Sequence, residues 1–175
     1  VPGGGTGGHV FPGRAAGREF LRRGHDVAMW CTGRDTEQAA RKEWDGPVVE
    51  VPARGFPSGC ALESRRRGWN LVRAVARSRA IMRLNRPDVL LAMGSYASVG
   101  PCGAARGLGV PTVLHEANVI PGRAVRLFAP GAAAVACRFE ETRYHPRRPQ
   151  LTALGLTLRE DCHAPAHRLP PAPAA

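Results

Sequence analysis

Apolar residues along the chain form short unbroken runs, and segments with helical spacing separate these runs. The apolar runs predict strands at 27–31, 48–51, 89–93, 112–114, 132–136 and 151–154. The intervening patterns predict helices at 12–23, 36–42, 65–84 and 98–108. Strands without polar alternation, separated by helices, are typical of a parallel sheet covered on both faces. We therefore expect an α/β fold with a doubly wound, Rossmann-like parallel sheet whose ligands bind at the carboxyl ends of the strands.

A glycine-rich segment, Gly3-Gly4-Gly5-Thr6-Gly7-Gly8-His9, precedes the first predicted helix. Because glycine has no Cβ, backbone N–H groups of such a loop can approach an anionic ligand closely. The positive end of the following helix points at the same place, which favours a phosphate or diphosphate.

The glycines also match the dinucleotide fingerprint Gly-x-Gly-x-x-Gly, a weak signal by itself. A dehydrogenase needs an acid at the end of the second strand to hold the ribose hydroxyls. The predicted strand here runs into Thr32-Gly33-Arg34, with no acid before Asp35, although Arg34 would suit a 2′-phosphate.

The composition indicates one domain with a basic surface. The 175 residues carry a formal charge of +11, and every basic residue except Lys42 is an arginine. Such a charge favours phosphate-bearing partners: nucleotides, nucleic acid or an anionic membrane. The five cysteines show no Cys-x-x-Cys spacing, which argues against a disulfide framework or a zinc site and for buried or incidental thiols.

The predicted helix at 65–84 allows two interpretations. Trp69, Val72 and Val75 recur at helical spacing among many arginines. An ordinary surface helix with its apolar side in the core explains this pattern. An interfacial membrane patch also explains it, since each arginine near an anionic surface contributes roughly 1 kcal/mol and an exposed tryptophan anchors in the headgroup layer.

Several motifs occur in one order along the chain. They are GGGTGGHVFPG at 3–13, Arg-Ala-Ile-Met at 79–82, Arg-Pro-Asp-Val at 86–89, Met-Gly-Ser-Tyr-Ala-Ser at 93–98, His-Glu-Ala-Asn at 115–118 and Leu-Gly-Leu-Thr-Leu-Arg at 154–159. Together they resemble the MurG family of peptidoglycan glycosyltransferases over about residues 3–160. The chain departs from the family pattern at Ser95, where a glycine is usual, and at Thr157, where a proline is usual.

The resemblance implies the N-terminal half of a two-domain GT-B-type enzyme. Residues 1–160 would form the acceptor-binding domain with its first strand truncated, and 161–175 a Pro- and Ala-rich disordered tail. The implied reaction transfers N-acetylglucosamine from UDP-N-acetylglucosamine to lipid I, the lipid-linked muramyl acceptor, and makes lipid II for the cell wall. The implied place is the cytoplasmic face of the cell membrane, on an anionic surface. We expect no metal, cofactor or nucleic acid partner, and no transfer by this chain alone.

The resemblance also implies site residues. His9 and Glu116 would be catalytic, with His9 as the general base. Substrate contacts would come from Thr6, Gly7, Gly8, Gly94, Ser95, Tyr96, His115, Asn118 and Arg159. Plainer roles stay open: a helix cap for His9, packing for His115 and Glu116, turn formation for Asn118, and a half-buried ring for Tyr96.

Two other classes of function compete with this interpretation. An NADP-dependent oxidoreductase is suggested by the fingerprint and Arg34. A non-enzymatic binder of anionic membranes or nucleic acid is suggested by the charge alone.

Overall fold

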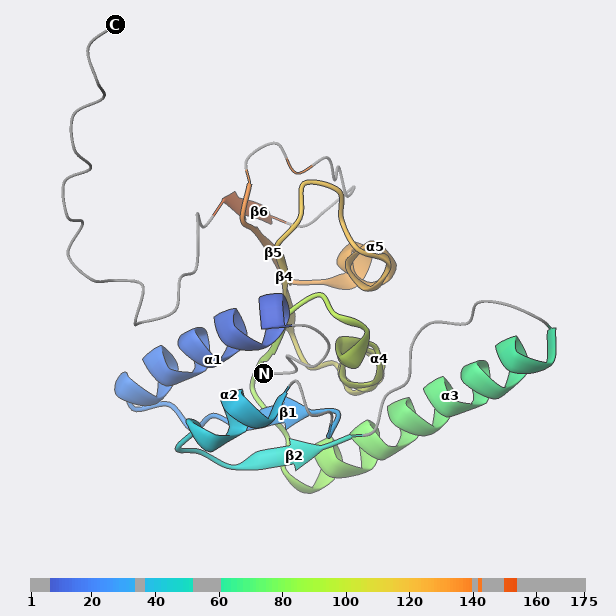
Figure 1. Ribbon diagram of the computed structural model, residues 1–175, viewed down its shortest axis with the longest axis horizontal. Helices are drawn as coiled ribbons and strands as arrows, with labels where there is room; N and C mark the ends of the chain where they lie inside the picture. Colours follow the sequence, from blue (N-terminus) through green and yellow to red (C-terminus); the bar gives the residue numbers. More distant parts are fainter. Residues whose placement is uncertain (1–6, 34–36, 52–60, 140–141, 143–149, 154–175) are drawn as a thin grey trace, which may run out of the picture.

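The computed structural model describes residues 7–33, 37–51, 61–139, 142 and 150–153. Helices and strands alternate along the chain (Figure 1). The helices are α1 (Gly7–Arg22), α2 (Gln38–Lys42), α3 (Ala61–Leu84), α4 (Val99–Leu108) and α5 (Arg123–Phe128), with 3₁₀ turns η2 (Tyr96–Ser98) and η3 (Ala129–Gly131). The strands are β1 (Met29–Cys31), β2 (Val48–Glu50), β3 (Leu90–Ala92), β4 (Thr112–Glu116), β5 (Ala134–Cys137) and β6 (Gln150–Ala153).

All pairs of described strands are parallel, as the apolar runs predict. They form two hydrogen-bonded sheets, β1-β2 and β3-β4-β5-β6, where we expected one. α1 lies on one side of the strands, and α3, α4 and α5 lie on the other (Figure 1). Helices on both sides of parallel strands agree with the predicted doubly wound α/β class.

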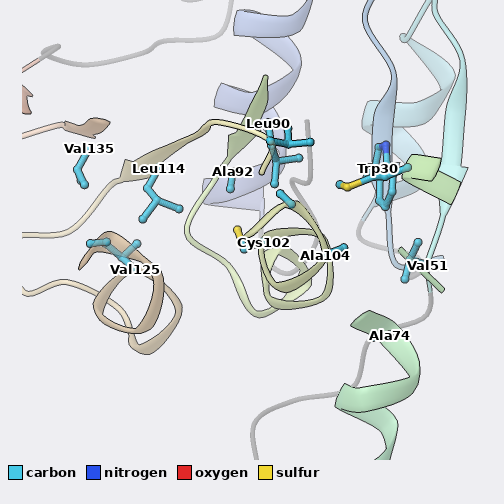
Figure 2. Packing of buried hydrophobic residues seen from close by; sticks show 14 of the residues in the cluster. Trp30, Val51, Ala74, Leu90, Ala92, Cys102, Ala104, Leu114, Val125 and Val135 are labelled. Carbon is cyan, nitrogen blue, oxygen red and sulfur yellow. The ribbon is translucent and has the colours of Figure 1, made fainter. Parts of the chain in front are cut away.

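Side-chain packing connects the two sheets. Trp30 of β1 belongs to the same buried cluster as Leu90 and Ala92 of β3. Figure 2 shows Trp30 and Val51 toward one end of this cluster and Leu114, Val125 and Val135 toward the other, with α4 between them. The two sheets therefore share one core although no backbone hydrogen bond joins β1 to β3.

Three helices differ from the sequence prediction, and one of them is α3, which begins at Ala61 and not at Arg65. α1 begins at Gly7 and not at Pro12, so the helix includes the end of the glycine-rich segment and has Pro12 in its interior. Helix α5, which the apolar pattern did not predict, has only six residues. Its buried Ala124 and Val125 pack on the sheet while Arg123, Arg126 and Leu127 face outward, too short a segment to show a helical period.

Glycines in α4 allow α3 to pack very closely against it. A Cβ on Gly100 would lie 3.2 Å from the backbone carbonyl carbon and oxygen of Ala74, and one on Gly103 would lie 2.9 Å from a methyl group of Val75. This close packing buries Ala74, Ser78 and Met82, and Trp69 and Val72 of the same helix are exposed. In the described part of the chain no helix is both long and apolar enough to cross a membrane.

Alanine substitutions at two helical glycines test this packing. In Gly100→Ala the new methyl group would lie 3.2 Å from backbone atoms of Ala74, which would have to shift by a few tenths of an ångström. We expect this strain to cost roughly 1–3 kcal/mol and to outweigh the gain of about 1 kcal/mol in helix propensity. We expect a net loss of stability of about 1 kcal/mol by urea denaturation. Gly68 of α3 has no atom within 4 Å of the corresponding position, so Gly68→Ala is expected to raise stability by about 0.5–1 kcal/mol. Equal effects at the two positions would contradict the packing argument.

Candidate functional site

The candidate site is formed where the carboxyl ends of β3 and β4 meet the first turn of α1. Because α1 begins at Gly7, the backbone N–H groups of Gly7, Gly8 and His9 have no acceptor within the helix. The first turn contains no acidic residue that would offset the positive end of the helix. This turn can therefore donate hydrogen bonds to an anionic group, as the glycine-rich sequence predicts.

Gly94, which follows β3, lies directly against the end of β4. Its φ of +71° is in the left-handed region that favours glycine. A Cβ at this position would lie only 2.6 Å from the carbonyl oxygen of His115. Packing alone thus requires glycine at 94, whether or not a substrate also contacts it.

The next two residues form the turn that leads into α4. Ser95 has φ −79° and ψ 167°, an extended conformation open to any residue, so the serine in place of the family's glycine causes no backbone strain here. Its carbonyl oxygen accepts a hydrogen bond from the N–H of Ser98. Tyr96 begins η2 and is partly buried, which leaves both of its proposed roles open.

The carboxylate of Glu116 organises the loop 117–122. Oε1 accepts hydrogen bonds from the backbone N–H of Asn118 at 2.9 Å and from its side-chain Nδ2 at 2.8 Å. Oε2 accepts a hydrogen bond from the N–H of Gly122 at 2.7 Å. Glu116 is 2 % exposed, and hydrogen bonds to a buried carboxylate are among the stronger ones in proteins. These contacts favour a positioning role for Glu116 and give Asn118 a role in the shape of the loop.

Within the described residues, three buried polar atoms at this edge have no hydrogen-bond partner: His9 Nδ1, Ser95 Oγ and His115 Nδ1. Leaving such an atom unpaired costs about 1–3 kcal/mol, and a bound ligand or water can supply the missing partner. His115 is 6 % exposed, and burial lowers the pKa of its imidazole. Glu116 opposes that shift, whereas His9 and Arg138 lie close enough to reinforce it.

The structure thus brings together His9, Gly94, Ser95, His115 and Glu116, with Asn118 in the adjoining loop. Thr6 and Arg159 lie outside the described residues. Sequence reasoning missed two residues of this site. Gly122 donates a backbone hydrogen bond to Glu116. Arg138 directly follows β5 and lies close enough to influence the pKa of His115 at the end of the neighbouring strand β4. A charged residue after an apolar strand was the available signal for Arg138.

Other features lie apart from this site. An open hollow of about 250 Å³ lies at the opposite edge of the sheet, lined by Arg86, Pro87, Asp88, Gly109, Val110 and Pro111, and shares no residue with the site. Cys31, Cys102 and Cys137 are buried free thiols, and burial raises the pKa of Cys102 to about 12. The described cysteines therefore match the predicted buried thiols.

Substituting two left-handed glycines separates backbone strain from packing. Gly109 has φ +67° with no atom near its missing Cβ, so Gly109→Ala should lose only the roughly 1–2 kcal/mol of a left-handed non-glycine residue. Gly94→Ala should lose more than that by about 1–3 kcal/mol, because its methyl group also meets the His115 carbonyl oxygen. Thermal or urea unfolding of both variants measures the difference, and equal losses would rule out the close contact.

The buried imidazole of His115 makes stability depend on pH. Burial holds the pKa of the folded imidazole below the usual histidine value of about 6.5, so the unfolded chain takes up a proton first as the pH falls. The contribution is complete above the unfolded pKa and is lost as the pH falls from there toward the folded pKa. As the pH falls from about 7.5 to about 5.5, the free energy of unfolding should therefore decrease less in His115→Gln than in the unmodified chain. The difference between the two pH slopes is at most about 1.4 kcal/mol per pH unit. Parallel urea titrations test this, and an unchanged pH slope would show that His115 is protonated equally in both states.

Sequence comparisons place the chain among sugar transferases. Residues 1–137 match the glycosyltransferase family 28 N-terminal domain. The UDP-N-acetylglucosamine–N-acetylmuramyl-(pentapeptide) pyrophosphoryl-undecaprenol N-acetylglucosamine transferase of Shewanella pealeana is 35% identical over 91% of this chain and 46% of its own length. The Pseudomonas putida protein of the same name is 36% identical over 95% of this chain and 46% of its own length. The chain thus spans about half the length of these curated relatives.

Solved structures show the same fold. The crystal structure of Acinetobacter baumannii MurG matches 84% of this chain and 43% of its own chain, with a TM-score of 0.72 and 24% identity. A putative UDP-N-acetylglucosamine 2-epimerase from Listeria monocytogenes matches 79% of this chain with a TM-score of 0.59 and 10% identity. Since a transferase and an epimerase share this fold, the fold alone does not decide the chemistry. The match of the family domain to residues 1–137 does decide the family: the chain belongs to glycosyltransferase family 28 and corresponds to its N-terminal domain.

Proposed function

We propose that the chain is the acceptor-binding part of an N-acetylglucosaminyltransferase that converts lipid I to lipid II. The observation that carries the proposal is the 35% identity, over 91% of the chain, to a transferase whose name specifies that donor and acceptor. The site supports it, because the N-terminal turn of α1 presents backbone N–H donors beside unpaired atoms of His9 and His115. A lipid-linked diphosphate sugar supplies both an anion for the donors and hydroxyl groups for the imidazoles.

In the proposed reaction His9 is the general base. Its imidazole removes the proton from the 4-hydroxyl of the muramyl sugar, and the resulting oxygen attacks the anomeric carbon of N-acetylglucosamine. The bond to UDP breaks on the opposite face, so the configuration at the anomeric carbon inverts. In this proposal two residues line the acceptor side: His115, whose carbonyl oxygen lies close to Gly94, and Asn118, whose side chain donates a hydrogen bond to Glu116.

The proposal also places the protein at the cytoplasmic surface of the membrane as a peripheral enzyme. Exposed Trp69 and Val72 on α3, with Arg73 and Arg77 nearby, suit the interfacial interpretation of this helix. A lipid-linked acceptor gives such a contact a purpose, since the diphosphate is reached at the headgroup layer.

The oxidoreductase alternative gains no support. In a dinucleotide enzyme an acid at the end of the second strand holds the ribose. Here Glu37 is fully buried, and its carboxylate accepts hydrogen bonds from Thr32 N at 2.7 Å, Thr32 Oγ1 at 2.6 Å and Gly33 N at 2.9 Å. This carboxylate therefore closes the turn after β1 and is not presented to a nucleotide, while Arg34 lies outside the described residues.

A hybrid enzyme tests the role of His9. Residues 1–160 of this chain would replace the matching segment of the Shewanella pealeana relative, and transfer would be followed with UDP-N-acetylglucosamine and a soluble lipid I analogue. His9→Ala should lower kcat by about 10²- to 10⁴-fold, the usual contribution of a positioned base. His9→Gln, which can still cap the helix, should be equally slow.

Binding of a fluorescent lipid I analogue to the unmodified chain provides the control for folding and acceptor affinity. We expect both His9 variants to bind the analogue within about threefold of the unmodified chain, since the proton transfer belongs to the transition state. A near-normal kcat in His9→Ala would assign the base elsewhere, and no analogue binding by the chain would contradict the acceptor-binding proposal itself.

A further inference from the structure

A second exposed apolar surface lies beside the candidate site, on the loop 117–122 and α5. Val119, Ile120 and Leu127 are 39 %, 75 % and 52 % exposed. Arg123 and Arg126, also exposed, lie among them in the sequence. These five residues are called the α5 patch below. The three apolar residues lie on one loop and the helix that follows it, and exposed apolar surface of this kind marks sites that contact a partner.

Hydrogen bonds fix the loop that carries part of the α5 patch. Glu116 accepts hydrogen bonds from Asn118 and Gly122, which lie on either side of Val119 and Ile120. Thr142 Oγ1 also donates to the carbonyl oxygen of Asn118 at 3.3 Å. Beneath the patch, Ala124 and Val125 are buried in the core. The apolar side chains of the patch are therefore exposed on a segment that is itself hydrogen-bonded and packed. Their exposure is not a consequence of poor packing.

The charge around the α5 patch points to an anionic lipid surface. The segment 117–139 contains no aspartate or glutamate, while Arg123 and Arg126 are solvent-exposed. Apolar side chains flanked by cations, without acids, are the composition that binds at the interface of an anionic bilayer. α5 also lies on the same side of the strands as α3, whose Trp69 and Val72 are exposed (Figure 1).

We propose that the α5 patch is a membrane contact separate from α3, in which Ile120 and Leu127 enter the headgroup layer of an anionic bilayer while Arg123 and Arg126 bind lipid phosphates. For its purpose the inference rests on the proposed function: the contact would bring the carboxyl edge of the sheet, with His9 and His115, to the level where a lipid-linked diphosphate emerges. The contact itself requires no acceptor or donor.

Tryptophan fluorescence tests the contact directly. Trp30 and Trp44 are buried and Trp69 is exposed, so Trp69→Phe leaves only buried reporters. Adding Ile120→Trp in that background places a reporter on the α5 patch, and Val89→Trp gives a matched control, since Val89 is 54 % exposed before the amino end of β3. Each chain is mixed with vesicles of phosphatidylcholine, with or without phosphatidylglycerol, containing lipids brominated in the upper acyl chain.

We expect the tryptophan at 120 to shift to shorter wavelength and to be quenched on phosphatidylglycerol vesicles only. The tryptophan at 89 should stay unquenched. Arg123→Gln with Arg126→Gln should lower the vesicle partition coefficient about tenfold, and added salt should lower it further. Leu127→Trp in the same background repeats the measurement should circular dichroism show that Ile120→Trp is misfolded.

Other outcomes overturn the inference. Quenching of Trp69 in the unmodified chain without quenching at 120 or 127 would mean that α3 alone contacts the bilayer. Equal quenching at 89 would mean nonspecific adsorption. Because these vesicles contain no acceptor, neither result bears on transfer, which the His9 and analogue-binding measurements judge separately.

Discussion

A carboxylate buried at the end of a strand must have its charge compensated by hydrogen bonds, and this requirement shapes the carboxyl edge of the sheet. Glu116 meets it with three donors from Asn118 and Gly122. The same bonds set the path of the loop 117–122 and the start of α5, and Ile120 is exposed on that loop. An uncompensated carboxylate here would cost several kcal/mol, so the loop cannot easily take another course while the strand keeps its place. The candidate site and the α5 patch both depend on this one side chain.

Close backbone contacts set the remaining geometry. Gly94 lets the turn after β3 lie on the carbonyl oxygen of His115, and Gly100 lets α4 lie on the backbone of α3. A Cβ at position 94 would clash with that oxygen, and one at position 100 would press on the backbone of α3, so the helices and turns on this side of the sheet have few alternative positions. The restriction has a chemical consequence. Among the described residues, the buried atoms His115 Nδ1 and Ser95 Oγ have no hydrogen-bond partner, and a bound molecule can supply one.

Much of the architecture could be predicted from the sequence. Apolar runs located the strands to within a few residues, because a strand buried on both faces is a continuous apolar run whose ends are marked by polar residues. The start of α1 was misplaced at Pro12, since proline usually marks a first turn, and helix formation extended back through Gly7. α5 was missed because one and a half turns carry too little periodicity to be recognised. The separation of β1-β2 from the other strands could not be predicted, because the residues of a single strand do not specify which other strand it pairs with.

The sequence by itself determined the class of the fold, the basic character of the surface and the presence of a glycine-rich turn beside histidines, since these follow from residue type and spacing. It also carried the motifs whose family the comparisons established. Only the tertiary structure showed which atoms surround Glu116 and Gly94. Glu116 was expected to be catalytic, and its neighbours in space engage both of its oxygens; Gly94 was expected to bind substrate, and a carbonyl oxygen from another strand already excludes any side chain there. A residue's chemistry is a property of its type, but the use of that chemistry depends on which atoms the fold places within hydrogen-bond distance.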